Sequence, residues 1–395
     1  MQQLELFDSN PPLIPLEDIF AAYYECRKNK RRTVNALQFE MNLEENLIQL
    51  WHELNSNTYE VGRSIAFLVY HPVIREVFAA DFRDRIVHHW IMQKIGPLLN
   101  KAMSPYSYSC RKGMGSLYGI RQVYEHVRGA SKGYTRDCYV LKLDIRAFFM
   151  HIRHTKLYQM LKKLLMSDYV KADKGLLLKI IKKIVYHLPQ KQCRIKGIRS
   201  DWVKLPKAKS LFFVDRGRGL PIGNLTSQIF ANFYLKTLDD FVSTRPGTFY
   251  GRYVDDMVII HPNKAFLIQL LKRIRLFLNR YYGLCLHPRK IILQHYKKGF
   301  AFVGAFLLPG RIYAGHRLKQ QFFCAIWKSK FLSAQKALAI LNSYFGFLRH
   351  YKTLQLRLKG WNLLRTTWQN LCIDNQAVKV FIRRNTQRHF THVSP

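Results

Sequence analysis

The sequence is poor in acidic residues, with 25 Asp and Glu against 64 Lys and Arg in 395 residues. The resulting net charge of +39 indicates a polyanionic partner, either a nucleic acid or an acidic membrane. Long apolar runs are also missing, since none reaches the roughly 18 residues of a membrane-spanning helix. The amino terminus lacks the basic start and apolar stretch of a signal peptide. We therefore expect a cytoplasmic protein that does not bind a membrane.

Cysteine is scarce, and the seven cysteines are scattered without any C-x-x-C pair. This spacing argues against a zinc site and is typical of buried, reduced thiols. Internal repeats and low-complexity tracts are absent as well. Hydrophobic residues nevertheless make up 48% of the chain, which is enough for sizeable cores and excludes a disordered basic tail. The length predicts two or three domains.

The few acidic residues include three at the ends of apolar segments. Asp144 closes the run that begins at Cys138, and Asp255-Asp256 lie between Tyr253-Val254 and an apolar, β-branched stretch. Adjacent carboxylates at a hairpin tip repel each other unless cations neutralise them, although Asp is also a common turn residue. Mg²⁺ prefers carboxylate oxygens, and paired ions assist phosphoryl transfer. The pattern predicts a site for two Mg²⁺ ions, with Mn²⁺ as a substitute.

The order of elements predicts an α+β fold. Residues 138–308 suit an antiparallel sheet with helices on one face, and this would bring Asp144 beside Asp255 and Asp256. We expect helices over 16–55, 82–99, 116–129, 152–166, 171–187, 225–241 and 264–282. We expect strands over 65–70, 77–79, 138–144, 211–214, 249–260, 291–295 and 300–308.

The remaining segments are interpreted as leader, loops and a helical tail. Residues 1–16 read as a leader, the basic run 28–32 as a solvated face or a phosphate contact, and 309–315 as a linker. Everything after Leu318 reads as helical. One apolar face of this tail is expected to be core: Trp327, Phe331, Leu338, Leu341 and Phe345. The adjacent His88 and His89 point about 100° apart on a helix and are not interpreted as a metal pair.

Several segments resemble the motifs of reverse transcriptases. Tyr253-Val254-Asp255-Asp256 is similar to their catalytic hairpin, and Leu143-Asp144-Ile145-Arg146-Ala147-Phe148-Phe149 to their first catalytic motif. Phe302-Val303-Gly304 resembles the primer-grip turn, and Lys290 follows the hairpin as in that family. The resemblance spans about residues 45–360 of the chain.

Other segments narrow the resemblance to diversity-generating retroelement reverse transcriptases, within the group II intron-like superfamily. Ile222-Gly223 with Ser227-Gln228 replaces the Gln-Gly and Ser-Pro of most relatives. Residues 79–89 and 107–113 also resemble that group. The segment before Glu76 departs from it, because a Lys is missing where His71-Pro72-Val73-Ile74-Arg75 stands. Arg75 remains as the phosphate-binding candidate.

The resemblance implies a right-hand polymerase with a ferredoxin-like antiparallel palm sheet. The N-terminal leader and fingers would occupy 1–137, the palm 138–310 with a fingers insertion at about 155–215, and a helical thumb and C-terminal tail 311–395. The catalytic residues would be Asp144, Asp255 and Asp256, with Ile145 as a further metal contact. Nucleotide-binding residues would be Arg75, Phe149, Ile222, Gly223 and Lys290. Template or primer contacts would be Gln228, Tyr253, Arg111, Lys112 and Gly304.

The implied activity is RNA-directed DNA synthesis from deoxynucleoside triphosphates on an RNA template and DNA primer. The implied product is complementary DNA with errors at template adenines, which diversifies a target gene. A structured retroelement RNA and a small, basic, helical and oligomeric accessory variability protein are the implied partners. Two alternatives stay open: a phage-defence or retron-type reverse transcriptase, and a non-catalytic RNA-binding scaffold. The glycine-rich loop 215–224 lacks a phosphate-cradle pattern, so it is not interpreted as an NTPase site.

Overall fold

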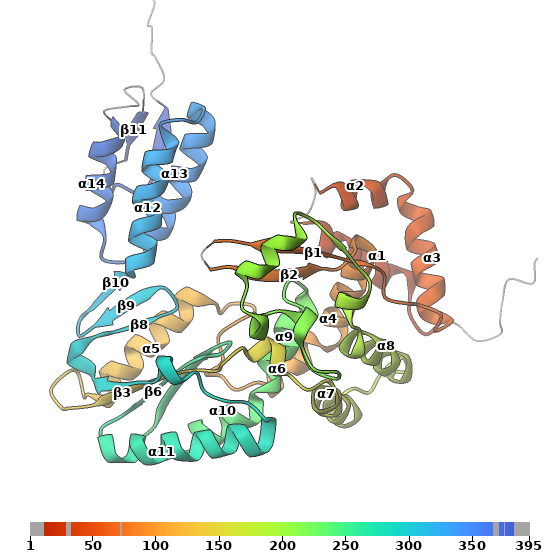
Figure 1. Ribbon diagram of the computed structural model, residues 1–395, viewed down its shortest axis with the longest axis horizontal. Helices are drawn as coiled ribbons and strands as arrows, with labels where there is room; N and C mark the ends of the chain where they lie inside the picture. The colour runs from red at the N-terminus through yellow and green to blue at the C-terminus, as the bar shows by residue number, and fades with distance from the viewer. Residues whose placement is uncertain (1–11, 29–32, 72, 366–370, 375, 383–395) are drawn as a thin grey trace, which may run out of the picture.

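A computed structural model of the chain describes residues 12–28, 33–71, 73–365, 371–374 and 376–382 (Figure 1). Residues 1–11 of the expected leader (1–16), residues 29–32 of the basic run, and 383–395 of the tail lie outside these ranges. Within them, no helix has the length and apolar character needed to cross a membrane.

The amino-terminal half combines helices with a small sheet. Its helices are α1 (Leu16–Arg27), α2 (Val34–Glu40), α3 (Leu43–Asn55), α4 (Phe82–Ala102), α5 (Ser116–Ala130), α7 (His154–Asp168) and α8 (Lys174–Tyr186). Its sheet has the order β2-β1-β4, from β1 (Ser64–Val69), β2 (Arg75–Ala79) and β4 (Cys193–Ile195). Asp81 caps α4, because its side chain accepts a hydrogen bond from the Arg83 amide.

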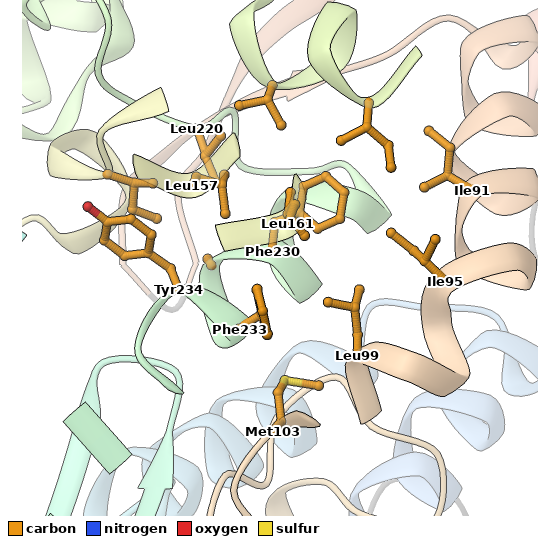
Figure 2. Packing of buried hydrophobic residues seen from close by; sticks show 14 of the residues in the cluster. Ile91, Ile95, Leu99, Met103, Leu157, Leu161, Leu220, Phe230, Phe233 and Tyr234 are labelled. Carbon is orange, nitrogen blue, oxygen red and sulfur yellow. The ribbon is translucent and has the colours of Figure 1, made fainter. Parts of the chain in front are cut away.

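Helices far apart in the sequence share one hydrophobic core. Figure 2 shows Ile91 and Ile95 of α4 facing Leu161 of α7 and Phe230 of α9 (Leu225–Tyr234). These four side chains are at most 1% exposed. The apolar face of α4 therefore lies in one core with α7 and α9.

The central sheet has four strands in the order β5-β6-β3-β7. They are β3 (Tyr139–Asp144), β5 (Phe249–Tyr253), β6 (Asp256–His261) and β7 (Ile292–His295), all paired antiparallel. Helices α9, α10 (Lys236–Ser243) and α11 (Lys264–Phe277) complete a β-α-β-β-α-β order, which is that of ferredoxin-like folds. The antiparallel sheet expected from the sequence is present.

Both faces of this sheet are covered, although helices were expected on one. Leu141 and Ile259 pack in the same core as Leu270 of α11. On the opposite face, Val140 and Val258 pack in a second core with α5 and the carboxy-terminal elements. Much of this second cover comes from α5 and from elements after residue 308, which a pattern within 138–308 cannot reveal.

The carboxy-terminal part is a small sheet followed by helices and a two-stranded ribbon. The sheet order is β10-β9-β8, from β8 (Phe300–Phe302), β9 (Ala305–Leu308) and β10 (Arg311–Ala314). Helices α12 (His316–Ser329), α13 (Ala334–Leu348) and α14 (Leu354–Arg365) stand beyond it in Figure 1. Strands β11 (Leu371–Ile373) and β12 (Val380–Ile382) pair with each other.

Several expectations about this part are wrong. Residues 309–315 include strand β10 and not only a linker, and the segment after Leu318 is not helical throughout, because β11 and β12 follow α14. Leu341 and Phe345 are buried, whereas Trp327 and Phe331 are 60% and 72% exposed. Trp327 lies in the last turn of α12 and Phe331 just after it, and these two exposed rings contact each other at a centroid distance of 5.2 Å.

Three further element predictions need correction. Residues 211–213 form a 3₁₀ turn and not a strand, with the Ser210 hydroxyl accepting from the Phe212 amide. The helix expected over 225–241 is broken at Leu235 into α9 and α10. The segment 300–308 is a hairpin, because Val303 and Gly304 both have positive φ, as in type I′ turns.

Candidate functional site

The three carboxylates lie at one end of the central sheet. Asp144 ends β3 and is paired in register with Asp256, the first residue of β6. Asp255 lies in the turn between β5 and β6, and its carbonyl accepts a hydrogen bond of 3.3 Å from the Ile145 amide. Strand pairing therefore brings together residues that are more than a hundred positions apart in the chain.

The turn that carries Asp255 has a strained backbone. Val254 adopts a φ of 56°, in the left-handed region that β-branched residues rarely occupy. Such a conformation costs about 1–3 kcal/mol and persists only where surrounding contacts hold it. The second left-handed residue near the site is Ala147, with a φ of 46° directly before the short helix α6 (Phe148–His151). Both carboxylate-bearing segments thus turn sharply where the strands end.

Burial and mutual repulsion change the acidity of the hairpin carboxylates. Burial, helped by the negative charge of Asp144, raises the pKa of Asp255 to about 6. Burial also raises the pKa of Asp256 to about 6, against the lowering effect of the Lys142 ammonium. These carboxylates are therefore less stable as anions than ordinary aspartates, and added positive charge would stabilise them.

Two lysines already supply part of that charge. The Lys290 Nζ lies 2.7 Å from Asp144 Oδ2, and the Lys142 Nζ lies 3.3 Å from Asp256 Oδ2. Lys290 was expected near the site, whereas Lys142 was missed. A signal for Lys142 existed, because it interrupts the apolar run that ends at Asp144. The Arg75 guanidinium also lowers the pKa of Asp255, so its charge acts on the same site.

The donor set fits a hard divalent cation by chemistry. In the described part of the chain, no group of three or more His, Cys, Asp or Glu side chains could hold a metal as placed. Asp256 Oδ1 is nevertheless buried and has no hydrogen-bond partner, as an unused metal ligand would be. Oxygen ligands from carboxylates are those Mg²⁺ prefers. Sharing one ion would require side-chain rotation of Asp144, Asp255 and Asp256, and their role as ligands stays a prediction.

Three of the expected nucleotide-binding residues, Phe149, Ile222 and Gly223, lie around β2 and α6. Phe149 and Ile222 both pack against a small cluster that contains Phe78. The Ile222 carbonyl accepts a hydrogen bond of 2.9 Å from the Phe78 amide. Gly223 has a φ of 123°, and a Cβ atom there would lie 2.7 Å from Val77 Cγ1. The need for glycine is therefore explained by packing against β2, and a nucleotide contact stays a prediction.

The loop before α5 carries two of the expected template contacts. The Arg111 guanidinium donates to Asn100 Oδ1 and to the carbonyls of Asn100, Ser104 and Ser107 at 2.6–3.0 Å. These bonds give Arg111 a role in holding the loop. Lys112 is exposed on the same loop, and its contact with the template stays a prediction.

The last three expected contacts lie in different places. The Gln228 amide oxygen on α9 accepts from the exposed Cys110 thiol at 3.4 Å. Tyr253 ends β5, half-buried beside the carboxylates and paired with Asp256. Gly304 lies in the β8–β9 turn, where a Cβ atom would meet nothing within 4 Å. Their contacts with template or primer stay predictions.

A buried polar network behind the hairpin was not predicted from the sequence. Arg252, directly before Tyr253, and Asp239 of α10 are both 0% exposed and form an ion pair of 2.6 Å. An arginine inside the strand that leads to the hairpin was the available signal. Its partner could not be identified, because Asp239 looks like an ordinary helix carboxylate in the sequence.

One comparison with known proteins identifies a family. Residues 74–307, more than half of the chain, match the family model described as reverse transcriptase (RNA-dependent DNA polymerase). No curated protein sequence matches the chain.

Solved structures of telomerases are among the similar folds. Apo telomerase from Candida tropicalis, truncated from its C-terminal domain, has 13% identity and a TM-score of 0.48, with 67% of this chain and 60% of that chain covered. Telomerase from Candida albicans in complex with a TWJ fragment of telomeric RNA has 10% identity and a TM-score of 0.46, with 78% and 55% covered. The match thus spans less than two thirds of either telomerase chain.

The family match covers the sheet, the three carboxylates and Lys290 together. It agrees with the expected enzyme class, an RNA-directed DNA polymerase. The chain therefore belongs to the reverse transcriptase (RNA-dependent DNA polymerase) family.

Proposed function

We propose that the protein copies an RNA template into DNA within a right-hand arrangement of fingers, palm and thumb. The fingers would comprise residues 1–137 with the insertion 155–215, the palm 138–310, and the thumb 311–395. The observation that carries the proposal is the convergence of Asp144, Asp255 and Asp256 at one end of a ferredoxin-like sheet. The net charge of +39 supports a nucleic-acid substrate.

The chain's own residues can prepare the reaction. Two bound Mg²⁺ ions would supply a more acidic primer 3′-hydroxyl and neutralise triphosphate charge. Asp144, Asp255 and Asp256 would hold these ions in their deprotonated forms. Arg75 would bind phosphate oxygens through its guanidinium fork, and Lys290 would exchange its contact with Asp144 for the incoming nucleotide.

Sugar selection is proposed to depend on Phe149. This ring contacts Phe148, at a centroid distance of 5.7 Å, and packs against both the core shown in Figure 2 and the small cluster that contains Phe78. A ring fixed by packing on both sides can exclude a 2′-hydroxyl, because it cannot move aside without disturbing its neighbours. This proposal carries over a role implied by the family resemblance.

The finer proposal is a diversity-generating role, with cDNA that is mutated opposite template adenines. Its support is the Ile222-Gly223 and Ser227-Gln228 pattern, where accurate relatives carry Gln before the glycine. Ile222 offers no hydrogen-bonding side chain to the nucleotide's sugar. A lost hydrogen bond is worth about 1 kcal/mol, which narrows the gap between right and wrong pairs. The proposed partners are a structured RNA and the small basic accessory protein.

The test of the finer proposal is the substitution Ile222→Gln. We expect up to about tenfold fewer errors opposite template adenine. The amide would restore one hydrogen bond to the nucleotide's sugar, which forms best when the nucleotide is correctly placed. The measurement is the error spectrum of cDNA made on one defined RNA with the same partners. An unchanged adenine error rate with intact synthesis would reject Ile222 as a determinant.

A matched control separates nucleotide contact from core disruption. Val214 packs against the same small cluster as Ile222 but lies outside the Ile-Gly segment. Val214→Gln introduces the same amide into this cluster and should leave the adenine error rate at the wild-type value. An equal gain in accuracy from both substitutions would assign the effect to loosened packing.

A further inference from the structure

Arg252 is a fully buried arginine whose side chain lies behind the catalytic hairpin. Its guanidinium donates five hydrogen bonds of 2.6–3.0 Å, to Asp239 Oδ1 and Oδ2, Asn232 Oδ1, the Asn232 carbonyl and the Val254 carbonyl. An arginine side chain has five N–H donors, so every donor is used. Its pKa is held above the ordinary value mainly by Asp239, against the lowering effect of burial.

The anchors of this arginine come from two helices. Asn232 belongs to α9 and Asp239 to α10, on either side of the break at Leu235. The Tyr250 hydroxyl also donates to Asp239 Oδ1 at 2.7 Å. A straight helix would place these residues seven positions apart along one axis, about 10 Å. The break lets both reach one guanidinium.

The Val254 carbonyl is the one acceptor within the turn itself. Arg252 Nη1 lies 2.8 Å from it, and Val254 is the residue with the strained φ of 56°. The carbonyl of a residue is oriented by its own ψ and by the next peptide. A fixed donor on this oxygen therefore restrains the peptide that leads into Asp255.

The same network reaches the loop before α5. The Arg252 amide donates to the Tyr106 carbonyl at 2.8 Å, and the Arg252 carbonyl accepts from the Tyr108 amide at 2.9 Å. The Ser107 hydroxyl donates to Asn232 Oδ1 at 2.7 Å, and Asn232 Nδ2 donates to the Ser109 carbonyl at 2.8 Å. The hairpin and the loop that carries Arg111 and Lys112 are therefore fixed to the same two residues.

We propose that Arg252 is a positioning residue, which holds the Val254-Asp255 turn in its left-handed form and so aims Asp255 and Asp256. The proposal rests on the proposed polymerase function. Asp239 and Asn232 act through Arg252, since they fix the guanidinium from which the fifth bond reaches the turn. Arg252 itself touches neither substrate nor the reacting atoms.

The chemistry of arginine explains why lysine cannot replace it. Lysine keeps the positive charge that Asp239 needs, but its three donors leave from one nitrogen at the end of a flexible stem. It cannot bind both Asp239 oxygens, Asn232 and the Val254 carbonyl together. Without the hydrogen bond to the Val254 carbonyl, the population of the left-handed turn should fall about ten- to a hundredfold.

The test compares Arg252→Lys with the double substitution Arg252→Lys/Val254→Gly. Arg252→Lys should lower kcat for primer extension about ten- to a hundredfold and raise the Mg²⁺ concentration that gives half-maximal rate. Glycine adopts positive φ without a steric cost, so Val254→Gly in the same background should restore at least tenfold of the lost kcat. A structural role of Arg252 in folding alone predicts no such rescue.

Two readouts do not depend on turnover. Hydrogen exchange in residues 250–258 should accelerate in Arg252→Lys, and Mn²⁺ titration of the protein–RNA complex should show weaker binding. Both changes should be reduced in the double variant. If Arg252→Lys keeps the wild-type kcat and metal affinity, or if Val254→Gly gives no rescue, the proposal is overturned.

Controls cover misfolding and failure of the proposed function. Arg357 is a buried arginine of α14 that donates to the Gln376 and Ala377 carbonyls, and Arg357→Lys should leave the Mg²⁺ midpoint at the wild-type value. If Arg252→Lys does not fold, the charge-neutral double variant Arg252→Gln/Asp239→Asn takes its place. This variant is measured with and without Val254→Gly, and the same rescue of kcat is required. If the wild-type chain with its RNA extends no primer, the proposed function fails and not the positioning role.

Discussion

The two segments that carry the candidate carboxylates are held in opposite ways. Asp144 ends a regular strand, and its side chain pairs with Lys290, which is 56% exposed. Asp255 and Asp256 lie on a hairpin with a left-handed valine, backed by an ion pair that is 0% exposed on both sides. One segment is set by strand geometry and the other by a buried polar network.

The two segments should differ in which substitutions they tolerate. An exposed ion pair contributes little to stability because water screens it, whereas a buried pair leaves an uncompensated charge when one partner is removed. The Asp144 segment should therefore tolerate loss of its lysine partner in folding. The hairpin should not tolerate loss of Asp239. Four predictions test this contrast between the two segments.

The largest effect is expected from Asp255→Asn. If Asp255 binds Mg²⁺ as proposed, loss of its carboxylate should lower DNA synthesis by at least about a hundredfold, while RNA affinity stays near the wild-type value because Lys and Arg supply it. Primer extension in Mg²⁺ and RNA titration provide the two measurements. Asp137→Asn is the control, since this carboxylate is 71% exposed and lies two residues before β3. More than a few per cent residual synthesis in Asp255→Asn would contradict the assignment.

The next effect concerns the buried pair behind the hairpin. Asp239→Asn should lower the free energy of unfolding on the order of 3–5 kcal/mol, because the Arg252 charge stays buried without its partner. Denaturant unfolding of the RNA-free protein is the measurement. A change below about 1 kcal/mol would show that water or another group replaces Asp239, and that the hairpin is not held as proposed.

A pH dependence should follow from the raised pKa of Asp255. Its folded value of about 6 exceeds the ordinary 3.8, so the folded state binds this proton more tightly. The resulting stabilisation is present below about pH 4 and is lost as the pH rises through about 6. Without metal, the wild type should lose roughly 2–3 kcal/mol more than Asp255→Asn between about pH 4 and pH 7. Thermal unfolding of both proteins measures this, and saturating Mg²⁺ should remove the difference.

The smallest effect is expected from Lys290→Ala. The free energy of unfolding should change by less than about 1 kcal/mol, because the pair with Asp144 is exposed. The KM for the incoming nucleotide should rise if Lys290 transfers its contact to the triphosphate. Parallel denaturation and steady-state kinetics separate these quantities. A stability loss as large as that of Asp239→Asn would remove the contrast between the two segments.

Agreement between sequence and structure was best where local pattern decides the outcome. Runs of apolar residues located β3 and β6, and Asp144 and Asp255 stood out as charges at the ends of these runs. Lys142 was overlooked although it lies in the same strand, because an alternating lysine looks like an ordinary exposed residue. Its contact with Asp256 follows from strand pairing alone.

Predictions failed where burial depends on distant elements. Trp327 and Phe331 continue an apolar helix stripe, yet they are exposed because no described element lies opposite them. The break at Leu235 has no proline or glycine to mark it. It is compatible with Asn232 and Asp239 both meeting Arg252, a contact that no window of the sequence contains.

Charge, strand periodicity and motif spacing are properties of the chain order. They were sufficient to predict a polyanion partner, the α+β class and three carboxylates at strand ends, because each prediction depends on residues close in sequence. Three features arise only when α5, α9 and α10 pack against the hairpin and its sheet. They are the covering of the second sheet face, the left-handed φ of Val254 and the five hydrogen bonds donated by Arg252. Packing sets these features, because the free energy of a buried charge or a strained turn depends on which groups surround it.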